Sequence, residues 1–214
     1  MDYTNPCDFI EKIKQSAVGR VEHEPYEKIL DIEYFNRLNL LFFKYVKKEP
    51  LQVKVFDEKW QLITKPAYII KENKCLVLFK HNVLAAVSKP FEGMKKILHF
   101  MSGLGVKLSK LHFPSEFLYK IVKEVDGELI TAKFVMPTSV GVIELRGSNL
   151  LQTKTFKELL NEGKLVKIGF IYPVQPNLIR IVYVDEHGSV AITGKFDVRY
   201  SAILLDKILS VNPR

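Results

Sequence analysis

Three adjacent residues, Asp185, Glu186 and His187, carry the carboxylate and imidazole groups that bind metal ions and transfer protons. Apolar residues alternate with other residues in the segments on either side, 179–184 and 190–192, and a glycine lies in the loop between them. Period-two segments around a polar, glycine-containing loop indicate a β-hairpin. A metal site needs several ligands, and a single His at a hairpin tip does not supply them. We therefore favour a turn for this tripeptide over a metal or acid–base site.

A second cluster, Glu22, His23 and Glu24, precedes Pro25. Two acids and a His this close in sequence usually all face water, so a solvated loop is the favoured interpretation. The chain has no glycine-rich phosphate loop, no Cys-x-x-Cys pair and no nucleophile-elbow serine, and its histidines are scattered without helical pairing. We therefore expect a protein without enzymatic activity, metal or cofactor.

The composition is that of a folded protein, because 214 residues of which 47% are hydrophobic are enough for a substantial core. No apolar run reaches the ~20 residues of a membrane-spanning helix, and the N-terminus carries acids where a signal peptide carries basic residues. Cys75 lies in an apolar run, which favours a buried free thiol over a disulfide with Cys7. We expect a soluble, intracellular protein with no membrane partner.

The two halves of the chain can be aligned so that their elements follow one pattern. Each half is predicted to contain a strand, a helix, a three-stranded antiparallel meander and a closing helix, which predicts an α+β fold of two pseudo-repeats. In the first half these are strands at 28–36, 52–56 and 67–79 with a turn at 72–74, and helices at 36–48 and 91–101. In the second half they are strands at 141–149, 165–169 and 179–196, and helices at 154–164 and 199–209. The alternative is that two unrelated α+β halves fall into partial register by chance.

The same pattern divides the chain into four segments. They are an N-terminal helical extension at 1–25, a first repeat at 26–103, a connector at 104–138 and a second repeat at 139–214. The connector is predicted to hold a helix at 114–125 and an extra strand at 127–137. Thr155 followed by Glu158 is predicted to form a capping box at the start of a helix. Trp60, the only tryptophan, lies at or beside a strand end, either at a loop tip or packed beneath it.

A run of residues in the second half has a distinctive order: a Pro, an apolar strand that ends in an aromatic residue, a Gly turn, a strand that ends in Thr-Gly, and a closing helix. These are Pro176, Tyr183, Gly188, Thr193, Gly194 and the helix at 199–210. In this order and in its two repeats the chain resembles the TATA-box-binding protein family, with 185–187 as a lengthened version of that family's short turn. The resemblance implies a curved sheet with helices on its convex face and a concave face that binds the DNA minor groove.

In that family four phenylalanines on the concave face wedge between base steps and kink the duplex. The resemblance places these positions at Val53, Ile70, Val166 and Tyr183, so none of them is Phe. It places the family's two minor-groove asparagines at Asp31 and Glu144. The minor-groove edges of A·T pairs offer only acceptors, and a carboxylate has no proton to donate to them. We therefore expect that the sheet does not bind the minor groove of TATA-like DNA in the way that the sheet of this family does.

The formal net charge of +8, from 32 basic and 24 acidic residues, favours an anionic partner such as nucleic acid, although lysine-rich solvated surfaces are common. With the resemblance, it favours a divergent transcription factor that binds double-stranded DNA and contacts proteins of the transcription machinery. Candidate DNA contacts are Lys54, Lys80, Lys167, Lys195 and Thr193. One alternative is a protein–protein adaptor in which the apolar residues at the four wedge positions form an exposed patch. Another is a substrate-recognition domain of a nucleic-acid enzyme.

Overall fold

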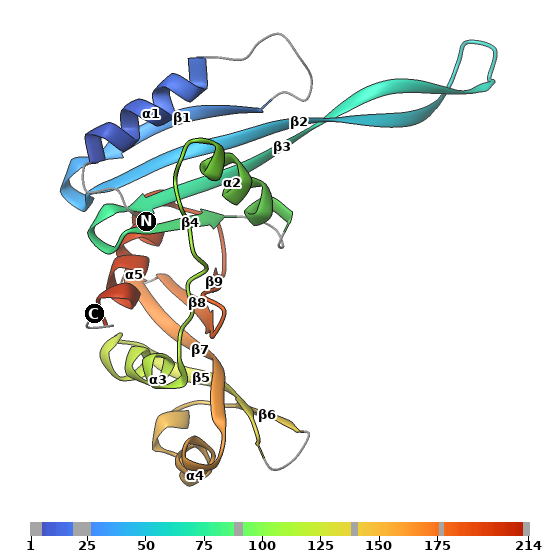
Figure 1. Cartoon of the computed structure of the whole chain (residues 1–214). Helices are drawn as coiled ribbons and strands as arrows, with labels where there is room; N and C mark the ends of the chain where they lie inside the picture. Colours follow the sequence, from blue (N-terminus) through green and yellow to red (C-terminus); the bar gives the residue numbers. More distant parts are fainter. Residues whose placement is uncertain (1–5, 19–26, 88–91, 138–140, 176–177, 212–214) are drawn as a thin grey trace. The chain divides into compact units, whose positions relative to one another are not determined.

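The computed structural model describes residues 6–18, 27–87, 92–137, 141–175 and 178–211. The chain folds as two compact units, unit 1 with residues 1–108 and unit 2 with residues 109–214. Both units are α+β, and each contains one antiparallel sheet (Figure 1). The division falls inside the segment 104–138, so the helix and the strand expected there belong to unit 2. No helix within the described ranges is long and apolar enough to cross a membrane.

Unit 1 is a four-stranded meander in the order β1-β2-β3-β4, with a helix before it and a helix after it. Its elements are α1 (Pro6–Val18), β1 (Glu27–Phe35), β2 (Leu40–Phe56), β3 (Leu62–Leu78), β4 (Val83–Val87) and α2 (Glu92–Gly103). The β1–β2 and β3–β4 connections are 3-10 turns that end at Asn39 and Asn82, both with positive φ. Asn tolerates that conformation, which lets both turns close tightly. The helix predicted in the N-terminal extension at 1–25 is confirmed as α1, and the closing helix predicted at 91–101 is confirmed as α2.

The helix predicted at 36–48 is wrong, because most of these residues form the first part of β2. The residues at 40–43, Leu-Leu-Phe-Phe, are buried at every position. A strand that is buried on both faces needs no polar alternation, so its apolar residues also fit a helical spacing. Phe43, Tyr45 and Val46 are residue types that favour a pleated strand, and β2 pairs with β1 and β3 along this stretch. Residues 40–47 therefore form a strand and not a helix, because they pair with β1 on one side and with β3 on the other.

The turn predicted at 72–74 is also wrong, because β3 runs through these residues without a break. β2 and β3 pair along their whole length, and the connection between them is the loop at 57–61. Among the described residues, the pairing of β1 with β2 extends up to Lys47, and that of β4 with β3 begins at Lys74. The hairpin beyond these points, residues 48–70, is a two-stranded ribbon that extends away from the sheet of unit 1, and we call it the arm (Figure 1).

Unit 2 is a five-stranded antiparallel sheet in the order β6-β5-β7-β8-β9. Its elements are α3 (Ser115–Glu124), β5 (Glu128–Val135), β6 (Val142–Arg146), α4 (Lys154–Glu162), β7 (Lys164–Gln175), β8 (Leu178–Asp185), β9 (Val190–Ile192) and α5 (Val198–Ser210). From β6 onward the element order is the predicted one, strand, helix, three strands and helix, and this prediction is confirmed. The strand predicted at 127–137 is confirmed as β5, and it lies inside the sheet between β6 and β7.

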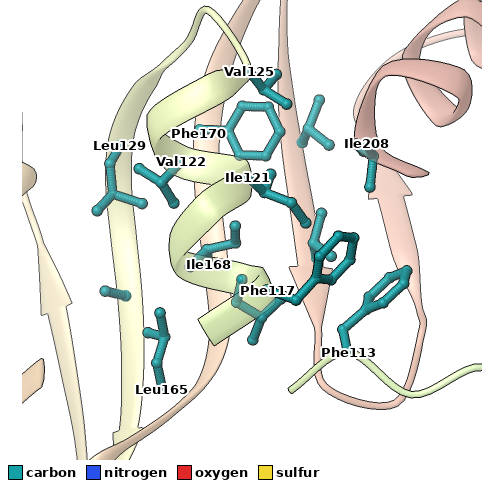
Figure 2. Packing of buried hydrophobic residues seen from close by; sticks show 14 of the residues in the cluster. Phe113, Phe117, Ile121, Val122, Val125, Leu129, Leu165, Ile168, Phe170 and Ile208 are labelled. Atoms are coloured by element: carbon teal, nitrogen blue, oxygen red, sulfur yellow. The ribbon is translucent and has the colours of Figure 1, made fainter. Parts of the chain in front are cut away.

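The helices of unit 2 pack on one face of its sheet. Phe117 and Ile121 of α3 and Ile208 of α5 form a cluster with Ile168 and Phe170 of β7 (Figure 2). These side chains are almost completely buried, and burial of an apolar side chain of this size stabilises a fold by roughly 1.5–3 kcal/mol. Because successive residues of a strand alternate between its faces, Lys167 and Gly169, the β7 neighbours of Ile168, belong to the opposite face of the sheet.

The start of α4 differs from the predicted capping box. The N-cap is Thr153, whose hydroxyl accepts a hydrogen bond from the backbone N–H of Phe156. Thr155, the predicted cap, lies inside the first helical turn. Thr153 has the extended backbone that an N-cap requires, and its side chain therefore satisfies one of the free N–H groups of the first turn. The helix itself was predicted at 154–164 and is confirmed.

The two units share one core arrangement. In unit 1 Phe43 pairs with Cys75 across β2 and β3, and in unit 2 Phe170 pairs with Val182 across β7 and β8. All four side chains are buried and belong to the cores that the helices cover. This register makes β2 equivalent to β7 and β3 equivalent to β8. Each unit is thus a helix, a four-stranded meander and a second helix, and β6 and α4 are an insertion in unit 2.

The sequence alignment of the two halves does not follow this register. It matches Ile70 with Tyr183 and Val53 with Val166, but Ile70 and Val53 lie in the arm, which has no counterpart in unit 2. Tyr183 follows Val182 directly, so its structural equivalent is Leu76. An ungapped alignment cannot accommodate an arm in one unit and an inserted strand and helix in the other.

Candidate nucleic-acid interface

The face of the unit 2 sheet opposite its helices, which we call the helix-free face, carries two rows of side chains that cross the strands. In the first row the successive partners are Glu144, Lys133, Lys167 and Asp185. In the second row they are Arg146, Thr131, Gly169, Tyr183 and Ala191. Arg146 is exposed, and Lys133 and Lys167 are half-buried. The register therefore brings three cations to one face beside an aromatic ring.

Glu144 lies among these cations. Its Oε1 accepts a hydrogen bond from Nε of Arg146 at 2.8 Å. That hydrogen bond, together with the positive charges of Arg146, Lys133 and Lys167, holds the pKa of Glu144 below its ordinary value, so the carboxylate is charged at neutral pH. Because the pair is exposed to water, it restrains Arg146 only weakly. Glu144 and Asp185 offset part of the positive charge in these two rows, in which Lys133, Lys167 and Arg146 outnumber the carboxylates.

Tyr183 lies against Gly169 on this face. A Cβ on residue 169 would lie 2.6 Å from Cε1 of Tyr183, so no side chain fits at this position while the ring stays in place. Nζ of Lys167 is 5.2 Å from the centroid of the Tyr183 ring, within the range of a cation–π contact. A flat ring beside lysine is a surface on which a sugar or a base can pack.

Thr193 continues the pairing beyond β9. Its hydroxyl accepts a hydrogen bond from the N–H of Ile181 at 2.9 Å, and its carbonyl accepts one from Nη1 of Arg180 at 2.9 Å. The next residue, Gly194, has a φ of +92, and any Cβ there would overlap the Arg180 guanidinium. Lys195 follows and is exposed. The Thr-Gly pair therefore fixes the end of the hairpin, and Lys195 lies at the rim of the sheet.

The tripeptide at 185–187 forms the turn between β8 and β9, and the predicted hairpin is confirmed. Oδ1 of Asp185 accepts hydrogen bonds from the N–H groups of His187 and Ser189. The carboxylate thus closes the turn, as Asp commonly does. Within the described ranges no three His, Cys, Asp or Glu side chains gather as a metal site would require. The cluster at 22–24 lies outside those ranges.

The remaining sequence-predicted contacts do not gather on one surface. Val53, Lys54 and Ile70 lie in the arm, and Lys80 lies in the 3-10 turn between β3 and β4. Val166 is 7% exposed, so it offers almost no surface to a ligand. The candidates that the fold brings together are Glu144, Lys167 and Tyr183, with Thr193 and Lys195 at the rim.

Asp31 lies at a β-bulge in β1, at the shift of register between Leu30 and Glu33. Its φ is 52, a left-handed conformation that Asp tolerates better than most residues. Its carboxylate lies 2.6 Å from Nζ of Lys44, and this bond raises the pKa of Lys44. Asp31 and Glu144, which the resemblance makes equivalent, thus occupy different local structures: Asp31 shapes a bulge, and Glu144 neutralises a neighbouring arginine.

Sequence reasoning missed Lys133, Arg146 and Gly169. Lys133 interrupts the apolar run of β5. Arg146 is two residues from Glu144, so strand alternation places these two on one face. Lys133 and Arg146 lie on the same face as Lys167 because β5 pairs with both β6 and β7, and a sequence pattern does not show this pairing.

Comparison with known proteins does not identify a family for this chain. The chain matches no protein-family model and no curated protein.

Proposed function

We propose that this chain is a non-catalytic, DNA-associated protein whose helix-free face in unit 2 binds the sugar–phosphate backbone of double-stranded DNA. The observation that carries the proposal is the gathering of Lys133, Lys167 and Arg146 on one sheet face beside Tyr183. Lysine and arginine bind phosphate oxygens, and an aromatic ring packs on sugars and bases. The net charge of +8 adds a long-range attraction toward a polyanion.

A role in transcription rests on the resemblance to TATA-box-binding proteins, and we retain it as a hypothesis. In that family the sheet face opposite the helices faces DNA, which corresponds to the face that carries Tyr183 here. The ring of Tyr183 lies against Gly169 instead of standing free as a wedge, and Glu144 brings a negative charge to the same face. Both features support contact with the backbone without insertion of the ring between base steps.

The test is the fluorescence anisotropy of labelled duplexes, one A·T-rich and one G·C-rich, at low and at moderate salt. We expect binding that weakens steeply with salt and differs little between the duplexes, because phosphate contacts carry no sequence information. Replacing Lys133 and Lys167 together by Ala is expected to reduce the slope of log affinity against log salt by about 0.9 for each phosphate that these lysines neutralise. A strong A·T preference would instead indicate minor-groove readout in the family manner.

The matched control replaces Lys120 and Lys157 together by Ala. These lysines are exposed on α3 and α4, the helices that pack on the other side of the sheet, and their loss changes the net charge equally. If both double variants weaken binding equally, affinity depends on net charge alone and the proposed face is wrong. Absence of binding even at low salt would exclude DNA and leave the protein adaptor as the better hypothesis.

A further inference from the structure

The tip of the arm is a turn at 57–61 with Trp60 at its fourth position. Oδ1 of Asp57 accepts hydrogen bonds from the N–H groups of Lys59 and Gln61. The N–H of Trp60 donates to the carbonyl of Asp57. This hydrogen-bonded geometry holds Trp60 at a φ of 60, in the left-handed region.

The same turn occurs in unit 2 at 185–189, with Gly188 at the fourth position. There Asp185 accepts hydrogen bonds from the N–H groups two and four residues later, and the N–H of Gly188 donates to its carbonyl. Gly188 has a φ of 76, which glycine adopts without steric cost. The chain therefore uses the residue best suited to this turn in unit 2 and a bulky aromatic residue in the arm.

Trp60 is unusual among the described residues. The other non-glycine residues with positive φ are Asp31, Asn39, Asn82 and Asn149. These are the two residue types that tolerate the conformation, whereas for a bulky side chain it is an outlier. Trp60 is also 81% exposed, so core packing does not account for it. Strained backbone that folding does not require is characteristic of functional sites.

The arm is not built to add a strand of another protein to its edges. Pro50 and Pro66 each lack an N–H group, and proline on an edge strand blocks continued pairing. A partner of the arm would therefore contact its tip or the faces of its two strands. Lys54, Lys59 and Lys65 are exposed along the arm, and their charge complements a polyanion. Phe56 lies beside Trp60, with the ring centroids 6.0 Å apart, and supports the indole.

We propose that Trp60 stacks on an unpaired base of DNA, an inference that rests on the proposed function. An exposed aromatic ring next to lysines is the pattern of a base-stacking contact, which tolerates any base because every base has a flat face. Opening an intact base step costs at least as much as one aromatic contact returns. The arm therefore favours DNA in which a base is already unpaired, such as a bulge, over a fully paired duplex.

The intrinsic fluorescence of the chain reports on this contact directly, because Trp60 is its only tryptophan. The full chain is titrated with a labelled duplex that carries one bulged adenine, and with the fully paired duplex of the same sequence. Label anisotropy measures binding, and tryptophan emission measures stacking. We expect quenching of Trp60 by the bulged duplex and affinity for it at least about fivefold above that for the paired duplex.

Trp60→Asn and Trp60→Phe separate stacking from folding. Asn suits the left-handed turn, so Trp60→Asn is expected to fold, to lose the preference for the bulged duplex and to keep the salt dependence of binding. Trp60→Phe is expected to keep part of the preference, because it retains an aromatic ring.

Two results would overturn the inference while leaving the proposed function intact. One is salt-dependent binding with unchanged Trp60 emission, which would point to a protein partner for the arm. The other is an undiminished bulge preference in folded Trp60→Asn. Absence of binding to both duplexes at low salt would reject the proposed function as well.

Discussion

The ring of Tyr183 occupies the space that a side chain on residue 169 would need, and Gly169 lies directly opposite it across the β7–β8 pair. A glycine inside a strand lowers stability through its conformational freedom and its missing side chain. Here the ring of the neighbouring strand covers the glycine and supplies the packing that a side chain at residue 169 would otherwise provide. Tyr183 and Gly169 therefore pack as a pair on the helix-free face, and a substitution of either residue affects the packing of the other.

Gly169→Ala is expected to destabilise the chain by about 1–3 kcal/mol, because the new methyl group overlaps the ring of Tyr183. Urea unfolding measures the loss. Tyr183→Ala in the same background should recover part of it, which a double-mutant cycle detects. Gly103→Ala is the control, since a Cβ there meets nothing within 4 Å. Equal losses at residues 103 and 169 would contradict the contact.

Trp60→Asn is expected to raise the free energy of unfolding by about 1 kcal/mol, because Asn adopts the left-handed backbone of the arm turn with less strain. Gly188→Ala at the equivalent position of the unit 2 turn should have the opposite effect. Its φ is 76, and a Cβ would lie 2.7 Å from the carbonyl oxygen of Leu111. Thermal unfolding of both variants checks the pair, and a destabilised Trp60→Asn would show that the indole packs more than its exposure indicates.

Stability should fall in acid through Glu186. The hydrogen bond from Lys164, and then the nearby charges of Lys164, His187 and His112, hold the pKa of Glu186 below the ordinary value of 4.5. A lowered folded pKa gives stability that is present above the unfolded pKa and is lost as pH falls through the folded one. Denaturant unfolding between pH 6 and 3 should therefore show a shallower decline in Glu186→Gln than in the native chain. A decline of equal steepness in the two would exclude this pair as a source of acid sensitivity.

The two cysteines should differ in reactivity. Cys7 is exposed, whereas Cys75 is buried, and burial raises the pKa of the Cys75 thiol to about 12. Because the thiolate is the reacting species, a thiol reagent at pH 8 is expected to modify Cys7 quickly and Cys75 only after denaturant is added. Cys7→Ser should then leave a native chain that is almost inert. Rapid labelling of that variant would show that unit 1 opens readily around β3.

Glu144→Gln is expected to strengthen binding to duplex DNA by about twofold to fivefold, since it frees Arg146 from an exposed ion pair and removes a charge that repels phosphate. Anisotropy at low salt measures the change. Glu116→Gln, an exposed acid on α3, makes the same change in net charge on the helix side of the sheet. An equal gain in both variants would mean that the gain does not depend on the helix-free face.

The helices α1 to α5 could be predicted from the sequence because each has an apolar stripe, which packs into the core of its unit. α5, for example, begins at Val198, directly after the N-cap Asp197, whose carboxylate accepts a hydrogen bond from the N–H of Tyr200. β2 could not be predicted in the same way, since burial on both faces removes the alternation that identifies a strand. The arm was missed for a related reason: the polar residues at 72–74 look like a turn, whereas the true turn at 57–61 has Trp at the position where a glycine is expected.

The candidate site was predicted in part. Lys167, Tyr183 and Glu144 were named from the sequence, and strand pairing brings them together. Lys133 and Arg146 were not, because their place on this face depends on register between strands that are far apart in sequence. Local alternation can show which residues of one strand share a face, but only pairing shows which strands contribute to it.

Because β2 and β3 pair continuously, the length of the arm can change without a change in the register of the two strands. No bulge interrupts its register from the sheet to the tip, so removing two residues from each strand keeps every remaining side chain on its own face. Each such step withdraws the tip by roughly 7 Å, which is about two base-pair steps along DNA. Paired deletions or insertions can therefore change the distance between Trp60 and the sheet without any change in the core of unit 1.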